Sequence, residues 1–143
     1  MIEADVRRTV GILNSTEDVV DLLRDLLGDE GYATSAAYIP DLKRGRLDVG
    51  VWLDALAPTA IVYDIPPPYE ENWAFYQAVQ ARPAAQKHRF IITTTNLRIL
   101  ECIAGPVEAI EFVGKPYDLA EILDRVALAL AEIDQEAVKA ADG

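Results

Sequence analysis

The segment AIVYDIPPP, residues 60–68, decides the class of fold that this chain adopts. Its first four residues, 60–63, are apolar and end at an acid, Asp64. A short apolar run without alternating polar residues is typical of a strand buried on both faces of a parallel sheet. The three prolines that follow, at 66–68, lack backbone N–H groups, so regular structure cannot continue through them. We therefore expect a central parallel strand that stops at Asp64.

Apolar segments of similar length lie on both sides of this strand. They predict further strands at residues 9–13, 32–38, 90–93 and 109–113. Helical periodicity separates them and is clearest at residues 19–27, where apolar side chains share one face until Gly28. Further helices are expected around 49–56, 73–79, 96–104 and 119–130, with a loop bracketed by Pro40 and Gly45 and fraying beyond Ile133.

Five strands that alternate with five helices predict an α/β fold. We expect a flavodoxin-like, doubly wound, five-stranded parallel sheet with strand order 2-1-3-4-5 and helices on both faces. The sequence contains no internal repeat, low-complexity stretch or linker. Residues 1–143 are therefore expected to form a single domain, with a core at about 9–133 and short polar tails.

Composition excludes several classes of protein. The chain has 13 basic and 24 acidic residues, a net charge of −11, and no basic cluster, which argues against nucleic-acid binding. One cysteine, Cys102, and one histidine, His88, cannot build a disulfide scaffold or a His/Cys zinc site. Because no apolar run approaches a membrane span and no secretory leader is evident, we expect a cytoplasmic protein without membrane contact.

Polar residues are expected to meet at the carboxyl edge of the sheet, where doubly wound folds bind ligands. The residues delivered there by successive strands are Asn14, Ser15, Asp64, Thr94, Thr95 and Lys115. A carboxylate, hydroxyls and an ammonium together suit the binding or transfer of a phosphoryl group. The sequence lacks G-x-G-x-x-G, G-x-x-x-x-G-K-[ST] and G-x-S-x-G, so dinucleotide, NTP and serine-hydrolase sites lose their support.

Two motifs resemble the receiver domain of bacterial two-component response regulators. The run Asp64-Ile65-Pro66-Pro67-Pro68 resembles the phosphoacceptor motif D-[IVL]-x-x-P, and Lys115-Pro116-Tyr117-Asp118 resembles K-P-F-D. Two further positions agree, Thr94 with the hydroxyl residue that ends strand four and Phe112 with the switch aromatic. The resemblance spans about residues 9–130 and implies a phosphoacceptor role for Asp64, with Thr94, Lys115 and Phe112 as the residues that stabilise or report the phosphoryl group.

The chain departs from the family at Asn14 and Ser15, which are normally acidic and help to hold Mg²⁺. A pocket with Asp64 as its one carboxylate is expected to bind Mg²⁺ only weakly, and no cofactor is required. Asn72 and Thr95 are smaller departures, since the family often has glycine and alanine there. The residues also have structural interpretations. Residues 14–16 suit a helix start capped by Ser15 or Thr16, Lys115 suits an ion pair with Asp64, and Phe112 suits the core.

These features predict an atypical, stand-alone receiver domain that signals through protein-protein contacts, with phosphorylation of Asp64 weak or absent. It is not expected to be an enzyme. Its expected partners are a histidine kinase or effector protein, or a second copy docked through segments 96–104, 109–113 and 119–130. One alternative is a working phosphoacceptor within a phosphorelay, and another is a flavodoxin-like enzyme or small-ligand binder that uses the same edge.

Overall fold

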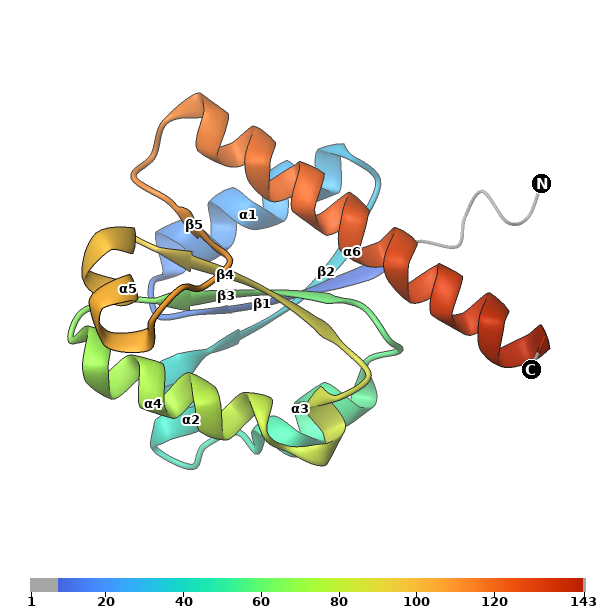
Figure 1. The fold of residues 1–143 in the computed structure, drawn as a ribbon, viewed down its shortest axis with the longest axis horizontal. Helices are drawn as coiled ribbons and strands as arrows, with labels where there is room; N and C mark the ends of the chain where they lie inside the picture. Colours follow the sequence, from blue (N-terminus) through green and yellow to red (C-terminus); the bar gives the residue numbers. More distant parts are fainter. Residues whose placement is uncertain (1–7, 143) are drawn as a thin grey trace.

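The computed structural model describes residues 8–142, which contain a sheet of five parallel strands. Figure 1 shows the strands at the centre of the molecule. They are β1 (Thr9–Asn14), β2 (Ala33–Tyr38), β3 (Ala60–Ile65), β4 (Arg89–Thr94) and β5 (Ala109–Glu111). Their order is β2-β1-β3-β4-β5, which confirms the predicted flavodoxin-like topology. The carboxyl ends of β1, β3 and β4 consequently meet at one edge.

Helices cover both faces of this sheet (Figure 1). One face carries α1 (Glu17–Asp29) and α6 (Pro116–Asp142), and the other carries α2 (Ile39–Lys43), α3 (Val49–Ala55), α4 (Tyr69–Gln80) and α5 (Leu97–Ala104). A short 3-10 helix, Pro83–Ala85, precedes β4. Within residues 8–142, no helix combines the length and the apolar character needed to cross a membrane.

The position of strand β3 in the sheet explains why residues 60–63 are all apolar. Ile61 and Tyr63 pack in the core beneath α3, α4 and α5, whereas Ala60 and Val62 pack in the core beneath α1 and α6. Successive side chains of a strand point to opposite faces, so both sets need apolar surroundings. The same alternation directs Asp64 towards the α1 and α6 side of the sheet.

The described chain has six α-helices where we predicted five. The additional helix, α2, spans residues 39–43 in the segment predicted as a loop. Pro40 lies in the first turn of this helix. A proline is tolerated there because the N–H that it lacks would have no partner within the helix. The proline therefore marks a helix start and not an interruption.

Three other predicted boundaries are wrong. Helix α1 continues through Gly28 to Asp29, and Gly31, at φ 92°, adopts the left-handed conformation that follows it. Helix α4 begins at Tyr69, directly after the prolines. Strand β5 ends at Glu111, two residues before the predicted end, because the backbone N–H of Val113 turns to the Asp118 carboxylate.

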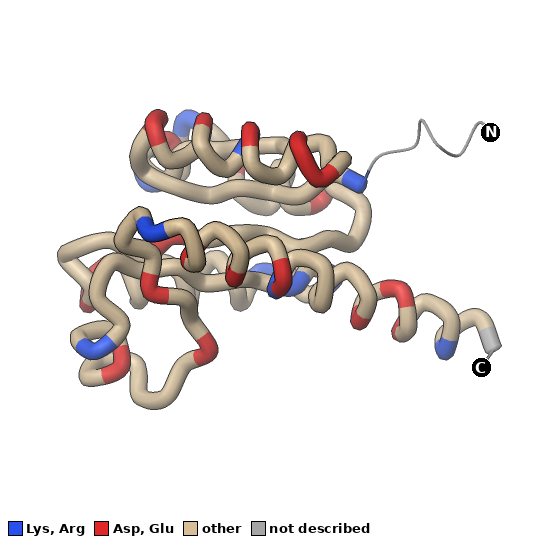
Figure 2. Tube along the Cα trace, turned by 90° about the horizontal axis from the view of Figure 1, so that it is seen from above, with Lys and Arg blue, Asp and Glu red and all other residues tan. Residues whose placement is uncertain are grey.

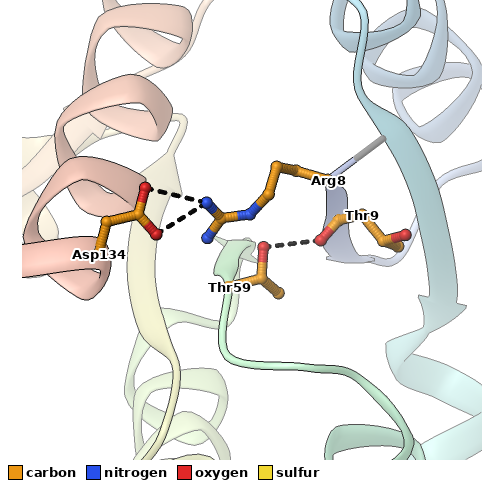
Figure 3. A network of polar contacts seen from close by, with 4 residues as sticks. All are labelled: Arg8, Thr9, Thr59 and Asp134. Carbon is orange, nitrogen blue, oxygen red and sulfur yellow. Dashed lines mark hydrogen bonds and ion pairs between the residues drawn. The ribbon is translucent and has the colours of Figure 1, made fainter. Parts of the chain in front are cut away.

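The predicted fraying beyond Ile133 is also wrong, since α6 continues to Asp142 and projects past the sheet (Figure 1). This last segment, DQEAVKAAD, contains mostly strong helix formers. Figure 3 shows a tertiary contact of the same segment, in which Arg8 Nη1 donates to both carboxylate oxygens of Asp134, at 2.9 and 3.1 Å. Beside it, Thr59 Oγ1 donates to the Thr9 carbonyl at 2.6 Å and fastens the start of β3 to the start of β1.

His88, for which the sequence predicted no role, connects two buried backbone groups. Its Nδ1 accepts a hydrogen bond from the Thr59 N–H at 3.2 Å, so Nε2 carries the proton and donates to the Leu53 carbonyl at 2.8 Å. The side chain is buried, and burial lowers the pKa of the imidazole below its ordinary value. The geometry is that of a structural clamp between α3, β3 and β4.

Replacing His88 with alanine should lower the free energy of unfolding by about 2–4 kcal/mol, because each buried group left unpaired costs roughly 1–3 kcal/mol. In the wild type, a lowered folded-state pKa means that the unfolded chain binds the proton more tightly. Stability should therefore fall as the pH drops below about 6.5, and His88→Ala should lack this component. Urea unfolding at neutral and mildly acidic pH measures both effects. Equal pH dependence in the two proteins would contradict the clamp.

Candidate functional site

Asp64 lies at the carboxyl end of β3, where its side chain is half-buried. Its Oδ1 accepts a hydrogen bond from Thr93 Oγ1 at 2.8 Å, and the two residues are paired in the β3–β4 ladder. Burial raises the pKa of the Asp64 carboxyl, and the bond from Thr93 acts in the opposite direction. The site thus contains one carboxylate that is partly shielded from water and held by one hydroxyl.

The hydroxyl that contacts Asp64 belongs to Thr93, one residue before the predicted Thr94. Thr94 is fully buried, and its Oγ1 donates to the Ile65 carbonyl at 2.9 Å. Neighbouring residues of a strand face opposite sides, so only one of these two threonines can share the side of Asp64. The third threonine, Thr95, forms a 2.7 Å hydrogen bond with Tyr69 at the start of α4.

Asn14 lies at the end of β1 with its side chain buried. Its Oδ1 accepts hydrogen bonds from the Ser15 N–H at 2.7 Å, the Thr16 N–H at 3.1 Å and Thr16 Oγ1 at 3.2 Å. Ser15 or Thr16 was the predicted cap of α1, but Thr16 occupies the N-cap position without a capping side-chain bond. The Asn14 amide oxygen instead organises this turn.

Lys115 is exposed and does not form the predicted ion pair, since residues 8–142 provide no contact of 4 Å or less between its ammonium and Asp64. Its Nζ lies 5.8 Å from the centre of the Tyr117 ring. The backbone N–H groups of Val113 and Lys115 both donate to Asp118 Oδ2, each at 3.0 Å. Because the buried Asp118 carboxylate accepts both bonds, it fixes the turn that carries Lys115.

Phe112 follows β5 directly, and its N–H donates to the Thr94 carbonyl at 2.8 Å. Its half-buried side chain packs against the core beneath α1 and α6. This position agrees with the structural interpretation of Phe112 as a core residue.

The edge offers few ligands for a divalent cation. Of Asn14, Ser15 and Asp64, only Asp64 has a carboxylate, and the Asn14 oxygen is already engaged by three donors. In the part of the chain that the structure describes, no group of three or more His, Cys, Asp or Glu side chains gathers where it could hold a metal. The arrangement can present the Asp64 carboxylate as a nucleophile and the Thr93 hydroxyl as a donor. The long side chain of Lys115 lies on the neighbouring turn.

Comparisons with known proteins bear on the fold. No protein-family model matches the chain, and no curated protein matches it in sequence. Two crystal structures of the chemotaxis protein CheY4 of Vibrio cholerae superpose with TM-scores of 0.57 and 0.58, at 17% and 16% identity. A CheY-like response regulator receiver domain from Methylobacillus flagellatus superposes with a TM-score of 0.57 at 14% identity. Each comparison covers 85% of this chain and 99% of the other. The chain therefore has the fold of a CheY-like response regulator receiver domain.

Proposed function

We propose that the chain is an atypical receiver domain that signals through protein-protein contacts, with phosphorylation of Asp64 weak or absent. The observation that supports this proposal is the hydrogen bonding of the Asn14 side chain. Its side-chain oxygen holds the turn into α1 through three hydrogen bonds, at the position where the resembling family has a metal-binding acid. A domain of this kind contributes a binding surface and not an enzymatic activity, and it requires no cofactor.

The donor set at the edge does not fit a tight Mg²⁺ site. Mg²⁺ requires octahedral oxygen ligation and is usually held by one or two carboxylates together with waters. Here Asp64 is the single acid among the three candidate ligand positions, and one of its oxygens accepts from Thr93. The burial that raises the pKa of Asp64 also disfavours its charged form. The single carboxylate and the burial of that carboxylate therefore both weaken the attraction of this edge for a divalent cation.

Protein contacts are supported by the surface formed by α5, β5 and α6. Ile99 and Ile103 on α5, Val113 after β5 and Tyr117 on α6 are large apolar side chains exposed to solvent. Isolated exposed apolar residues are ordinary, but a group of them on adjacent elements is typical of a contact surface. We propose this surface for a histidine kinase, an effector protein or a second copy of the chain.

The negative charge of α1 and α6 favours partners with a basic surface. Figure 2 shows acidic residues along α1 and α6. On α1 they are Glu17, Asp18, Asp21, Asp25 and Asp29, with Arg24 as its one basic residue. Negative potential over this side would accelerate encounter with a partner that carries a basic patch.

The alternative of a working phosphoacceptor is favoured by the contact between Asp64 and Thr93. A carboxylate at the end of β3 next to a hydroxyl donor supplies a nucleophile and a group able to bond a phosphoryl oxygen. Lys115, on the adjacent turn, would supply the cation that neutralises it. In this alternative, a kinase transfers its phosphoryl group to Asp64 in spite of the poor metal site.

Incubation with acetyl phosphate and Mg²⁺, followed by intact-mass measurement, tests the proposal. The wild type should keep the mass of the unmodified chain, because little Mg²⁺ is held beside Asp64 to neutralise the incoming phosphoryl group. The variant Asn14→Asp, Ser15→Asp is the matched control and should gain one phosphoryl group. A phosphoryl group on the wild type that disappears in Asp64→Asn would establish the alternative.

A further inference from the structure

The carboxyl edge contains a second feature, an open pocket of about 370 Å³ whose lining includes Ser15 but not Asp64. It lies between the β1–α1 turn, α2 and the loop before α4. Its polar lining comprises Ser15, Lys43, Arg44 and Asn72, and its apolar lining includes the prolines at 66–68. The volume is within the range of small-ligand sites.

Two cations line this pocket, and no carboxylate does. Within residues 8–142, neither Lys43 nor Arg44 has an acidic partner within 4 Å, whereas the nearby Arg46 pairs with Asp41 at 3.7 Å. The protein as a whole has a net charge of −11, so a pocket lined by two unneutralised cations runs against its average composition. Such a concave cationic surface concentrates anions.

The ammonium of Lys43 is positioned by neutral groups. Its Nζ donates to Asn72 Oδ1 at 2.5 Å and lies 5.4 Å from the centre of the Phe75 ring. Asn72 is buried, and its Nδ2 donates to the Pro66 carbonyl at 2.9 Å. These contacts orient the ammonium without cancelling its charge, and two of its three N–H donors remain for a ligand. A positioned cation loses less entropy when a ligand binds.

We propose that this pocket binds a small phosphomonoester or phosphonate. A dianionic group matches the two positive charges, because Lys43 and Arg44 both donate charge-assisted hydrogen bonds to its oxygens, and the Ser15 hydroxyl lies on the same wall. The rings of the prolines offer no N–H donors and restrict the backbone, so they form a preformed apolar wall. The organic part of the ligand packs against that wall. This site is separate from the function proposed for Asp64.

Phenylphosphonate is the probe, because it contains the dianion and an apolar ring but cannot transfer a phosphoryl group to Asp64. Titration followed by amide NMR should show saturable binding to the wild type, with shifts in the residues around the pocket that carry an amide N–H, at 39, 41–44 and 69–72. The double variant Lys43→Gln, Arg44→Gln should bind at least about tenfold more weakly, the equivalent of one lost charge-assisted contact. The matched control, Arg46→Gln, removes a cation from the same loop outside the pocket and should bind as the wild type does.

Two further arms make the proposal falsifiable. Asp64→Asn should leave the affinity for phenylphosphonate unchanged, and inorganic phosphate should bind the wild type more weakly than phenylphosphonate because it lacks the ring. Absence of saturable binding, or equal binding by the Lys43/Arg44 double variant, would overturn the proposal. Tighter binding to Asp64→Asn would also overturn it, because the anion would then lie at Asp64. Equal affinity for inorganic phosphate and phenylphosphonate would contradict the proposed contact between the ring and the prolines.

Discussion

The double substitution Asn14→Asp, Ser15→Asp is expected to raise the affinity for Mg²⁺ by about 10- to 100-fold. Changes of this size in metal affinity are produced even by groups that only contact the ligands. In metal-free buffer the same variant should melt at a lower temperature than the wild type. Two added carboxylates near Asp64 repel one another and raise each other's pKa, and a divalent cation relieves that repulsion. The gain and the loss therefore have one cause, the density of negative charge at the edge.

Thermal melts with and without Mg²⁺ measure both effects. The wild type should melt at nearly the same temperature in the two buffers, whereas the double variant should be stabilised by Mg²⁺. The substitution Asn14→Asp alone keeps the oxygen that accepts from Ser15 and Thr16, so it separates the effect of charge from disruption of the turn. Identical melting of the double variant in both buffers would mean that residues 14 and 15 do not face Asp64.

Replacing Asp64 with asparagine should stabilise the folded chain at neutral pH. Burial raises the folded-state pKa of this carboxyl, so the folded state binds its proton more tightly than the unfolded state does. The stabilisation that this proton provides is complete at low pH and is lost as the pH rises through the raised pKa. Asparagine carries no charge, and its amide oxygen can still accept the hydrogen bond from Thr93. Denaturant unfolding between about pH 4 and 7 should show a flatter profile for the variant than for the wild type.

The same substitution distinguishes the proposed phosphate-independent function from the alternative of a working phosphoacceptor. If output does not require phosphate, wild type and Asp64→Asn should bind a captured partner with affinities equal within about twofold, with or without acetyl phosphate. If Asp64 is a working nucleophile, only the wild type treated with the phosphodonor should bind more tightly, because the variant cannot form an acyl phosphate. That pattern would refute the phosphate-independent mode.

The receiver-like architecture could be predicted because its signals are local. The apolar run at 60–63, the stop at Asp64 and the leucine stripe of α1 each depend on residues close in sequence. Their periodicity determines the element type, and alternation of strands with helices leaves few topologies. The sheet order and the location of Asp64 at the carboxyl end of β3 follow from the same patterns.

Side-chain partners at the edge could not be predicted, because they depend on register and on segments far apart in sequence. Successive threonines at 93, 94 and 95 are equivalent in sequence, and only the pairing of β3 with β4 places Thr93 beside Asp64. Lys115 was expected to pair with Asp64, but Asp118 turns the backbone at Val113 and Lys115 so that the ammonium lies near Tyr117.

The sequence by itself therefore determined the class of fold, the strand order and the residues delivered to the carboxyl edge, since each follows from hydrophobic periodicity along the chain. The tertiary structure decided which of those residues meet. It engaged the Asn14 oxygen in the turn into α1, placed Lys43 against Asn72 and extended α6 to an ion pair with Arg8. These contacts join residues whose separation along the chain leaves no periodic signal, and they form only when packing of the two cores brings their elements together.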